Sequence, residues 1–261
     1  MSLFNDPAAG ETTGNAGGLR VALVTGGTSG IGAAIAARLR ADGLRVAITG
    51  RTAPPGLDAT DPNLLFLKYD LTEPGAPAKI VDDVIARFGR LDVLVNNAGR
   101  RHAGTIQETP LEEIAAVFEV NTFAAMAMTS AAARVMAAQH EGTIVNMISR
   151  LATIGVATLS TYSASKGALL AYTRAAAIEL APSNIRVNAV APGMTSTPLI
   201  DDWLSDQPDP GQALNAVVDS VPLGRLATTE DVAAAVSYLA SLDARYITGI
   251  SIPVDGGYTA Q

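Results

Sequence analysis

The chain has 261 residues, of which 48% are hydrophobic and 16% are charged, and its formal net charge is −7. This composition is typical of a globular protein, and an acidic chain without a cluster of Lys and Arg is not expected to bind nucleic acid. The absence of cysteine and the presence of only two histidines exclude disulfides, thiolate nucleophiles and a histidine-rich metal site, so we expect no metal.

The N-terminal residues 1–18 are polar, acidic and rich in glycine, and they lack the basic and apolar regions of a signal peptide. We expect residues 1–18 to form a flexible arm and residues 19–261 to form a single domain. No stretch reaches about 18 uninterrupted apolar residues, the length of a membrane-spanning helix. We therefore expect no membrane partner and, without a targeting signal, a cytoplasmic location.

Short apolar runs alternate with helix-forming segments along the rest of the chain. The predicted strands are 19–25, 45–49, 64–68, 91–95, 143–147, 185–190 and 250–254. The predicted helices are 33–42, 76–88, 111–139 with a break near Asn121, 161–181 and 230–242. This alternation predicts an α/β fold of the Rossmann type, a doubly wound and mostly parallel sheet of about seven strands with helices on both faces.

Residues 197–224 interrupt this alternation. They contain the loop-forming cluster Asp206-Gln207-Pro208-Asp209-Pro210-Gly211. Long insertions in compact domains often cover a functional site, so we expect this segment to act as a substrate lid.

A glycine-rich turn joins the first predicted strand to the first helix. Gly26, Gly30 and Gly32 permit a tight turn and the close approach of a pyrophosphate to the helix N-terminus. This arrangement predicts a dinucleotide cofactor, although strand–helix turns also use glycine for purely structural reasons.

The second predicted strand ends at Thr49-Gly50-Arg51, without an acidic residue. An acidic residue there would bind a ribose 2′-hydroxyl, whereas Arg accommodates a 2′-phosphate. We therefore predict that NADP(H) is preferred over NAD(H), with Thr28 and Ser29 as further hydroxyl donors. The alternative is an Arg51 that stacks on the adenine or points to solvent.

Tyr162 and Lys166 lie four residues apart in the predicted helix 161–181, and therefore on one face. A positive charge beside a phenol lowers its pKa, which suits proton transfer near neutral pH. A surface Tyr and a solvated Lys would have the same spacing, so the pair needs support from elsewhere in the chain. That support comes from placement, because several motifs follow the carboxyl ends of predicted strands, where ligands bind in open α/β sheets. These positions are Gly26, Arg51, Asn97, Ser149 and Pro192.

The complete set of motifs, in this order, resembles the short-chain dehydrogenase/reductase family, classical type, over residues 21–257. Besides the glycine turn and Tyr162-Ser163-Ala164-Ser165-Lys166, the resemblance rests on Asp70-Leu71, Asn96-Asn97-Ala98-Gly99, Asn121, Ser149, Pro192-Gly193 and Asp255-Gly256-Gly257. It implies hydride transfer between NADP(H) and a small-molecule carbonyl or alcohol substrate, and a homotetramer or homodimer.

The resemblance also implies residue roles. Tyr162 would be the general acid/base, and Lys166 would lower its pKa and hold the nicotinamide ribose. Ser149 would bind the substrate oxygen, and Asn121 would hold a water in a proton relay with Lys166. The further cofactor contacts implied are Gly26, Thr28, Ser29, Gly30, Ile31, Gly32, Arg51, Asp70, Leu71, Asn97, Ala98, Gly99, Pro192, Gly193 and Thr195.

The chain departs from the family pattern after Gly99, where Arg100, Arg101 and His102 replace the usual apolar residue. Arg100, Arg150 and Trp203 are candidate substrate contacts. A solvated loop is the alternative for the arginines, and an anchor for residues 197–224 is the alternative for Trp203. The alternative function is a non-catalytic NAD(P)-binding sensor or scaffold, which would be expected to have lost Tyr162 or Lys166.

Overall fold

A seven-stranded sheet forms the centre of the computed structural model, which describes residues 19–261; the expected arm, residues 1–18, lies outside the described residues. The strands are β1 (Val21–Thr25), β2 (Arg45–Gly50), β3 (Leu64–Lys68), β4 (Val93–Asn96), β5 (Gly142–Met147), β6 (Ile185–Pro192) and β7 (Ser251–Val254). Their order is β3-β2-β1-β4-β5-β6-β7, and all six pairings are parallel. The carboxyl ends of all strands therefore share one edge, and the chain reverses its winding between β1 and β4, as predicted for a doubly wound fold.

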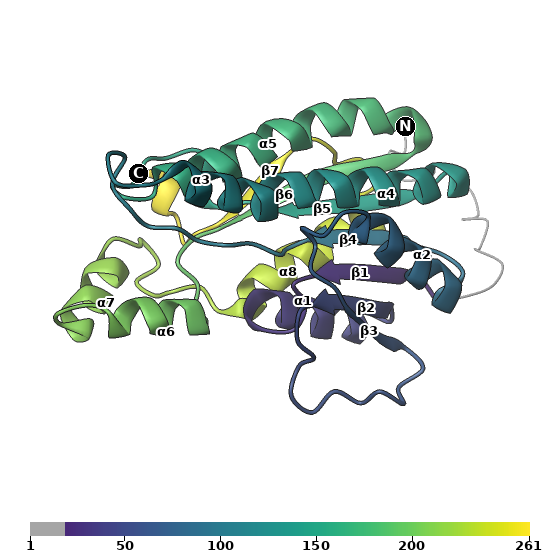
Figure 1. Ribbon diagram of the computed structural model, residues 1–261, viewed down its shortest axis with the longest axis horizontal. Coiled ribbons are helices and arrows are strands. Elements are labelled where there is room, and N and C mark those ends of the chain that lie inside the picture. Colours follow the sequence, from purple (N-terminus) through teal and green to yellow (C-terminus); the bar gives the residue numbers. More distant parts are fainter. Residues whose placement is uncertain (1–18) are drawn as a thin grey trace, which may run out of the picture.

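Helices cover both faces of this sheet (Figure 1). They are α1 (Gly30–Ala41), α2 (Ala76–Phe88), α3 (Leu111–Phe118), α4 (Ala124–Gln139), α5 (Ser160–Leu180), α6 (Pro198–Ser205), α7 (Pro210–Asp219) and α8 (Thr229–Ala240). A π-helical turn, η1 (Glu119–Phe123), joins α3 to α4, and single 3₁₀ turns are η2 (Arg150–Ala152), η3 (Ala181–Ser183), η4 (Leu242–Ala244) and η5 (Tyr258–Ala260). Helices α2, α4 and α5 lie over one face and α1 and α8 over the other, while α6 and α7 stand apart from both layers (Figure 1).

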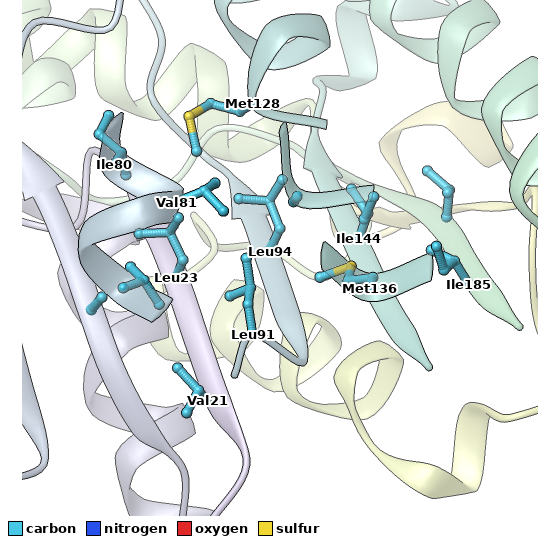
Figure 2. Packing of buried hydrophobic residues seen from close by; sticks show 14 of the residues in the cluster. Val21, Leu23, Ile80, Val81, Leu91, Leu94, Met128, Met136, Ile144 and Ile185 are labelled. Carbon is cyan, nitrogen blue, oxygen red and sulfur yellow. The ribbon is translucent and has the colours of Figure 1, made fainter. Parts of the chain in front are cut away.

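The core is divided by the sheet into two apolar layers. Successive side chains of a strand point to opposite faces, so Val21 and Leu23 join the layer beneath α2, α4 and α5, whereas Ala22 and Val24 join the layer beneath α1 and α8. Figure 2 shows the first layer, in which Leu23 and Leu94 lie near Val81. Burial on both faces explains why the strands are continuous apolar runs in the sequence.

Elements α3, η1 and α4 form one continuous helical run, Leu111–Gln139. By length and composition alone this run could cross a membrane, and 39% of its most apolar window is buried. Met128, Ala132 and Met136 are fully buried in the core layer against the sheet. The run is therefore placed as a helix that covers a sheet, and the predicted break near Asn121 is the π-helical turn.

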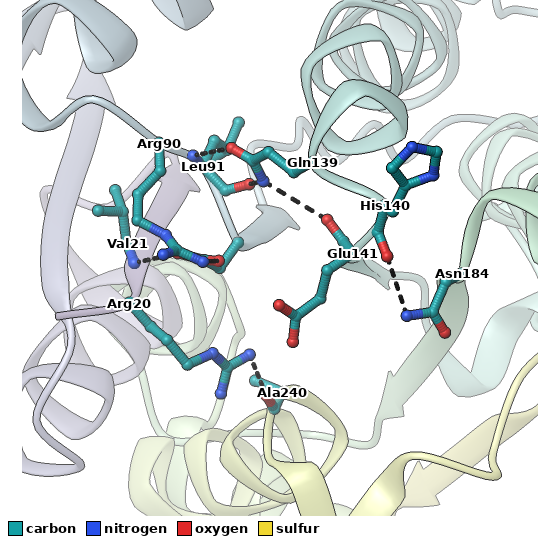
Figure 3. A network of polar contacts seen from close by, with 10 residues as sticks. Arg20, Val21, Arg90, Leu91, Gln139, His140, Glu141, Asn184 and Ala240 are labelled. Atoms are coloured by element: carbon teal, nitrogen blue, oxygen red, sulfur yellow. Dashed lines mark hydrogen bonds and ion pairs between the residues drawn. The ribbon is translucent and has the colours of Figure 1, made fainter. Parts of the chain in front are cut away.

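A polar network closes the edge of the sheet at the amino ends of β1 and β4 (Figure 3). The buried carboxylate of Asp92 accepts hydrogen bonds from the backbone N–H of Val21 at 2.7 Å and from Arg90 Nε at 2.8 Å. Gln139 Nε2 donates to the Leu91 carbonyl at 2.8 Å, and the Leu91 N–H donates to Gln139 Oε1 at 3.1 Å. These contacts account for a buried charge far from the carboxyl edge, so the chemistry is to be sought at the opposite end of the sheet.

Candidate active site

The glycine turn between β1 and α1 is a close-packed backbone cradle. A Cβ on Gly32 would lie 2.1 Å from the carbonyl oxygen of Gly26, and one on Gly26 would lie 3.0 Å from Cα of Ala98. Gly26 also has a φ of +63°, which L side chains rarely adopt. No larger residue fits these positions, and the turn presents its backbone at the N-terminus of α1, which begins at Gly30 rather than at residue 33.

Asn97 ties the end of β4 to this turn. Its Nδ2 donates to the carbonyl oxygens of Thr25 and Gly26 at 3.0 and 3.1 Å. In return, Thr25 Oγ1 accepts from the backbone N–H groups of Asn97 and Ala98 at 3.0 and 3.1 Å. Thr25, which was not predicted as a site residue, thus fixes two of the predicted cofactor contacts; its position at the end of a strand, just before the first glycine, was the available signal.

The end of β2 carries the residues predicted to select the cofactor. Thr28 packs against Gly50, where an added Cβ would lie 2.8 Å from Thr28 Cγ2. Arg51 follows β2 directly and is exposed. Hydrogen bonds from Thr72 lower the pKa of Asp70, and the charge of Arg51 contributes further, so Arg51 and Asp70 lie in one another's field. Ser29, the residue before α1, makes no side-chain capping bond.

Lys166 is buried, whereas the other two lysines of the chain, Lys68 and Lys79, are exposed. Its Nζ donates to the carbonyl oxygen of Met147, the last residue of β5, at 2.8 Å. Burial lowers its pKa from the ordinary value of 10.5 to about 8. A buried ammonium without a carboxylate partner is costly, and its presence therefore marks a functional position.

Tyr162 lies one turn before Lys166 on α5, as the spacing predicts, and Lys166 Nζ is 5.9 Å from the centre of its ring. The expected lowering of the Tyr162 pKa by Lys166 is not what the structure shows. Burial raises the pKa of Tyr162, while a hydrogen bond with Ser149 and the positive charge of Arg101 act in the opposite direction. The penalty of burying a phenolate is the largest of these effects and sets the direction of the shift.

Ser149 lies just beyond β5, with Ile148 between it and the strand. It precedes η2, and its Oγ accepts a hydrogen bond from the Leu151 N–H at 3.2 Å. The hydroxyl proton is left to interact with Tyr162 or with a substrate oxygen. The hydrogen bond between Ser149 and Tyr162 joins the loop after β5 to the start of α5, thirteen residues later in the chain.

Asn121 occupies the π-helical turn, a feature often found at functional sites. Its side chain exchanges two hydrogen bonds with the Arg100 backbone, accepting at 2.7 Å and donating at 2.9 Å. It also donates to Ser165 Oγ at 3.0 Å. Asn121 therefore fixes the loop after Gly99 against α5; Ser165 is a second residue that the sequence analysis did not assign.

A buried network beneath the site joins β4, β5, α4 and α5. Asn96 Nδ2 donates to Asn146 Oδ1 at 2.9 Å and to Thr129 Oγ1 at 3.0 Å. Asn146 Nδ2 donates to Thr173 Oγ1 at 2.9 Å. These hydrogen bonds join the strand ends to α4 and α5 and fix their register, while Asn96 Oδ1 is buried without a partner among the described residues. Polar residues inside apolar runs were the sequence signal for them.

One cavity of about 480 Å³ at the carboxyl edge brings most of the predicted site together. Its predicted members are Ile31, Asn97, Gly99, Arg100, Ser149, Arg150, Tyr162, Lys166, Pro192, Gly193, Thr195 and Trp203. Predicted residues outside the lining are Gly26, Thr28, Ser29, Gly30, Gly32, Arg51, Asp70, Leu71, Ala98 and Asn121. Members that the prediction did not include are Met147, Ile148, Leu151, Val156, Ala157, Thr158, Leu159, Met194, Thr197, Ile200 and Val217, together with Arg101, which it mentioned without assigning.

The arginines next to Gly99 and Ser149 are differently placed. Arg100 pairs with Glu113, and His102 lies outside the cavity, near Glu113 and Thr109. Arg101 lines the cavity. The guanidinium of Arg150 lies over the ring of Tyr258 at 3.6 Å, and its Nη1 is buried without a hydrogen-bond partner among the described residues.

Comparison with known proteins is consistent with this geometry. Residues 26–259 match the family model described as "Enoyl-(Acyl carrier protein) reductase". The chain is 36% identical to cyclopentanol dehydrogenase of Comamonas sp. (strain NCIMB 9872), over 93% of this chain and 98% of that protein. It is 39% identical to cis-4-hydroxycyclohexanecarboxylate dehydrogenase of Sinomonas cyclohexanicum, over 92% and 97%. A solved structure, ElxO with NADP bound, superposes with a TM-score of 0.86 at 30% identity, covering 93% of this chain and 100% of that one. The chain thus belongs to the short-chain dehydrogenase/reductase family, classical type, and is an oxidoreductase of that family.

Proposed function

We propose that the protein transfers a hydride between NADP(H) and a small carbonyl or alcohol substrate. The observation that carries this proposal is the meeting of Ser149, Tyr162 and Lys166 in one cavity at the carboxyl edge of the sheet. Relatives named for dehydrogenation of cyclic alcohols support the substrate class. A sensor or scaffold of the same fold would have no need of a buried lysine beside a tyrosine.

The residues fit a dinucleotide. The turn around Gly26 and Gly32 admits no Cβ, and its backbone lies at the start of α1, where a helix N-terminus would hold a pyrophosphate. Pro192, Gly193 and Thr195 would border the nicotinamide side; Gly193 is held so close to Asp255 that a Cβ would lie 2.8 Å from Asp255 Cα. When bound, the nicotinamide supplies or accepts the hydride.

The side chains supply proton transfer and orientation. In the direction of reduction, the Tyr162 hydroxyl donates its proton to the carbonyl oxygen as negative charge develops there. Ser149 Oγ donates a hydrogen bond to the same oxygen. Lys166, with a pKa of about 8, is mostly protonated at neutral pH and places a positive charge beside the phenol. Oxidation of an alcohol reverses these proton movements.

We further propose a preference for NADP(H), supported by the exposed Arg51 at the end of β2, by the free hydroxyl of Ser29 and by NADP in the structure of ElxO. A lid role for residues 197–224 is supported by Ile200, Trp203 and Val217, which α6 and α7 contribute to the cavity.

A homotetramer or homodimer is supported by exposed apolar side chains on η1, α4 and α5, among them Phe123 and Ile178. The cytoplasmic location stays a prediction.

The decisive experiment is Tyr162→Phe, with Tyr238→Phe as a matched control on the exposed face of α8. We expect Tyr162→Phe to bind NADPH as the unaltered protein does and to lose ketone reduction by about a hundredfold or more. Tyr238→Phe should retain both. Full turnover by Tyr162→Phe would refute the proposed mechanism, and tight NADPH binding without turnover of any ketone by the unaltered protein would favour the sensor alternative.

A further inference from the structure

The substrate cavity has a charge opposite to that of the protein. Its ionisable lining residues other than tyrosine are Arg100, Arg101, Arg150 and Lys166, and neither Asp nor Glu is among the described residues that line it. The chain as a whole carries a formal net charge of −7. Four cations that line one cavity of an acidic protein attract an anionic ligand wherever nearby groups do not compensate them.

Two of these cations have an evident role or partner. Lys166 belongs to the proton-transfer group and donates to the Met147 carbonyl. Arg100 forms an ion pair with Glu113, outside the cavity, which neutralises it. Neither is therefore available for a further ligand.

The other two are incompletely compensated. Arg101 is partly buried and, within the part of the chain that the structure describes, makes no ion pair or hydrogen bond. It nevertheless lies close enough to Tyr162 for its charge to act on the phenol. Arg150 stacks on Tyr258, and Asp255 lies in its field, but its buried Nη1 has no acceptor.

We infer that the substrate carries an anionic group, a carboxylate, sulfonate or phosphate, bound by Arg101 with Arg150 as a second donor. This inference rests on the proposed function, because it places the reacting carbon at Tyr162 and the anion at the arginines beside it. A guanidinium binds such planar or tetrahedral anions through two parallel hydrogen bonds, which Arg101 can form with nitrogens that have no other partner among the described residues. Apolar side chains, among them Leu151, Trp203 and Val217, form part of the remaining wall and suit a hydrocarbon body.

The test compares each anion with a neutral molecule of the same shape. The probes are oxocyclohexanecarboxylate, levulinate and para-acetylbenzoate, each paired with its primary amide. Trp203, the only tryptophan of the chain, lines the cavity, so its fluorescence reports binding to the NADP⁺-loaded protein without turnover. Reduction of the same probes by NADPH gives kcat/KM for each pair.

We expect at least one carboxylate to bind about tenfold to a hundredfold more tightly than its amide, the usual range for a charge-assisted hydrogen bond. Arg101→Gln should abolish this ratio and leave amide binding and the KM for NADPH within about threefold, less than one such bond would change them. Arg100→Gln should reduce the ratio only slightly because Glu113 already neutralises Arg100. Arg245→Gln, at an exposed residue that directly follows η4 and does not line the cavity, should leave it unchanged.

Three results would overturn the inference: no carboxylate preferred over its amide, a preference retained in Arg101→Gln, or an equal loss in Arg100→Gln, which would indicate a diffuse field instead of a binding site. A rise of the NADPH KM in Arg101→Gln, with the anion ratio unchanged, would assign Arg101 to the cofactor. Tighter binding of carboxylates without reduction of any probe would support the anion site and count against the proposed function, so the two failures are distinguishable.

Discussion

Replacing Lys166 with Met should make the protein more stable and inactive at the same time. The side chain is buried, and its pKa falls from 10.5 to about 8, so burying the ammonium costs about 3 kcal/mol of the free energy of unfolding at neutral pH. Met has nearly the same length and no charge. It forfeits the hydrogen bond to the Met147 carbonyl, which costs about 1 kcal/mol. The net gain is therefore about 2 kcal/mol, or roughly 4–8 °C in Tm for a domain of this size.

The stability difference between Lys166→Met and the unaltered protein should depend on pH. Below pH 8 the lysine is protonated in both the folded and the unfolded protein, and the full cost of burial is present. Between pH 8 and 10.5 the unfolded protein binds more protons than the folded one, so the stability of the unaltered protein rises with pH relative to that of Lys166→Met. The advantage of the variant should thus be largest at neutral pH and shrink as the pH approaches 10.5.

Thermal unfolding followed by circular dichroism over this pH range measures the effect, without added cofactor. Lys79→Met is the matched control, since Lys79 is exposed on α2, and its effect should stay within about 0.5 kcal/mol. A Lys166→Met variant that is less stable than the unaltered protein at neutral pH, or whose difference from it does not change with pH, would refute the reasoning.

Three further predictions concern the cofactor edge and the proton donor. Thr25→Val should lower the free energy of unfolding by about 2 kcal/mol in denaturant titrations, because the N–H groups of Asn97 and Ala98 lose their acceptor; an unchanged midpoint would contradict this. Arg51→Asp should raise the KM for NADPH far more than that for NADH, and equal effects would show that Arg51 does not contact the 2′-phosphate. The rate of oxidation of a neutral alcohol should rise with pH above neutrality, since burial raises the Tyr162 pKa and the phenolate is the base. In Arg101→Gln that rise should move to still higher pH, because a positive charge that favours the phenolate has been removed; a shift to lower pH would be inconsistent with the charge arrangement.

Local patterns predicted the parts of the fold that short-range physics determines. Residues 64–68 and 76–88 are a strand and a helix with the expected bounds, since apolar runs and a closing Gly89 mark them clearly. Helix α1 begins earlier than expected because the glycines of the turn are also its first residues. Helices α6 and α7 were predicted only as an insertion, although each begins with a proline, a residue that favours the first helical position.

In the candidate site, too, the sequence predicted what a single helix fixes and not what contacts between distant segments determine. The spacing of Tyr162 and Lys166 placed them on one face because a helix fixes the geometry of positions four apart, and the motifs at the strand ends supplied the further support. The net direction of the Tyr162 pKa was predicted wrongly, since burial of the phenol depends on packing between distant segments and raises the pKa.

The surroundings of the arginines depend on contacts between distant parts of the chain, and a single sequence carries no periodic signal for them. Arg150 stacks on Tyr258, a residue more than one hundred positions later in the sequence. Arg100 is neutralised by Glu113 on α3. Arg101 is adjacent to Arg100 and chemically identical to it, and both line the cavity, yet Arg101 has no partner among residues 19–261. Asn121 holds the backbone of Arg100 against η1 and so fixes the course of the loop at that point. The residue expected to serve a proton relay therefore also holds in place the loop that carries Arg101, and with it the charge that we expect to select the substrate.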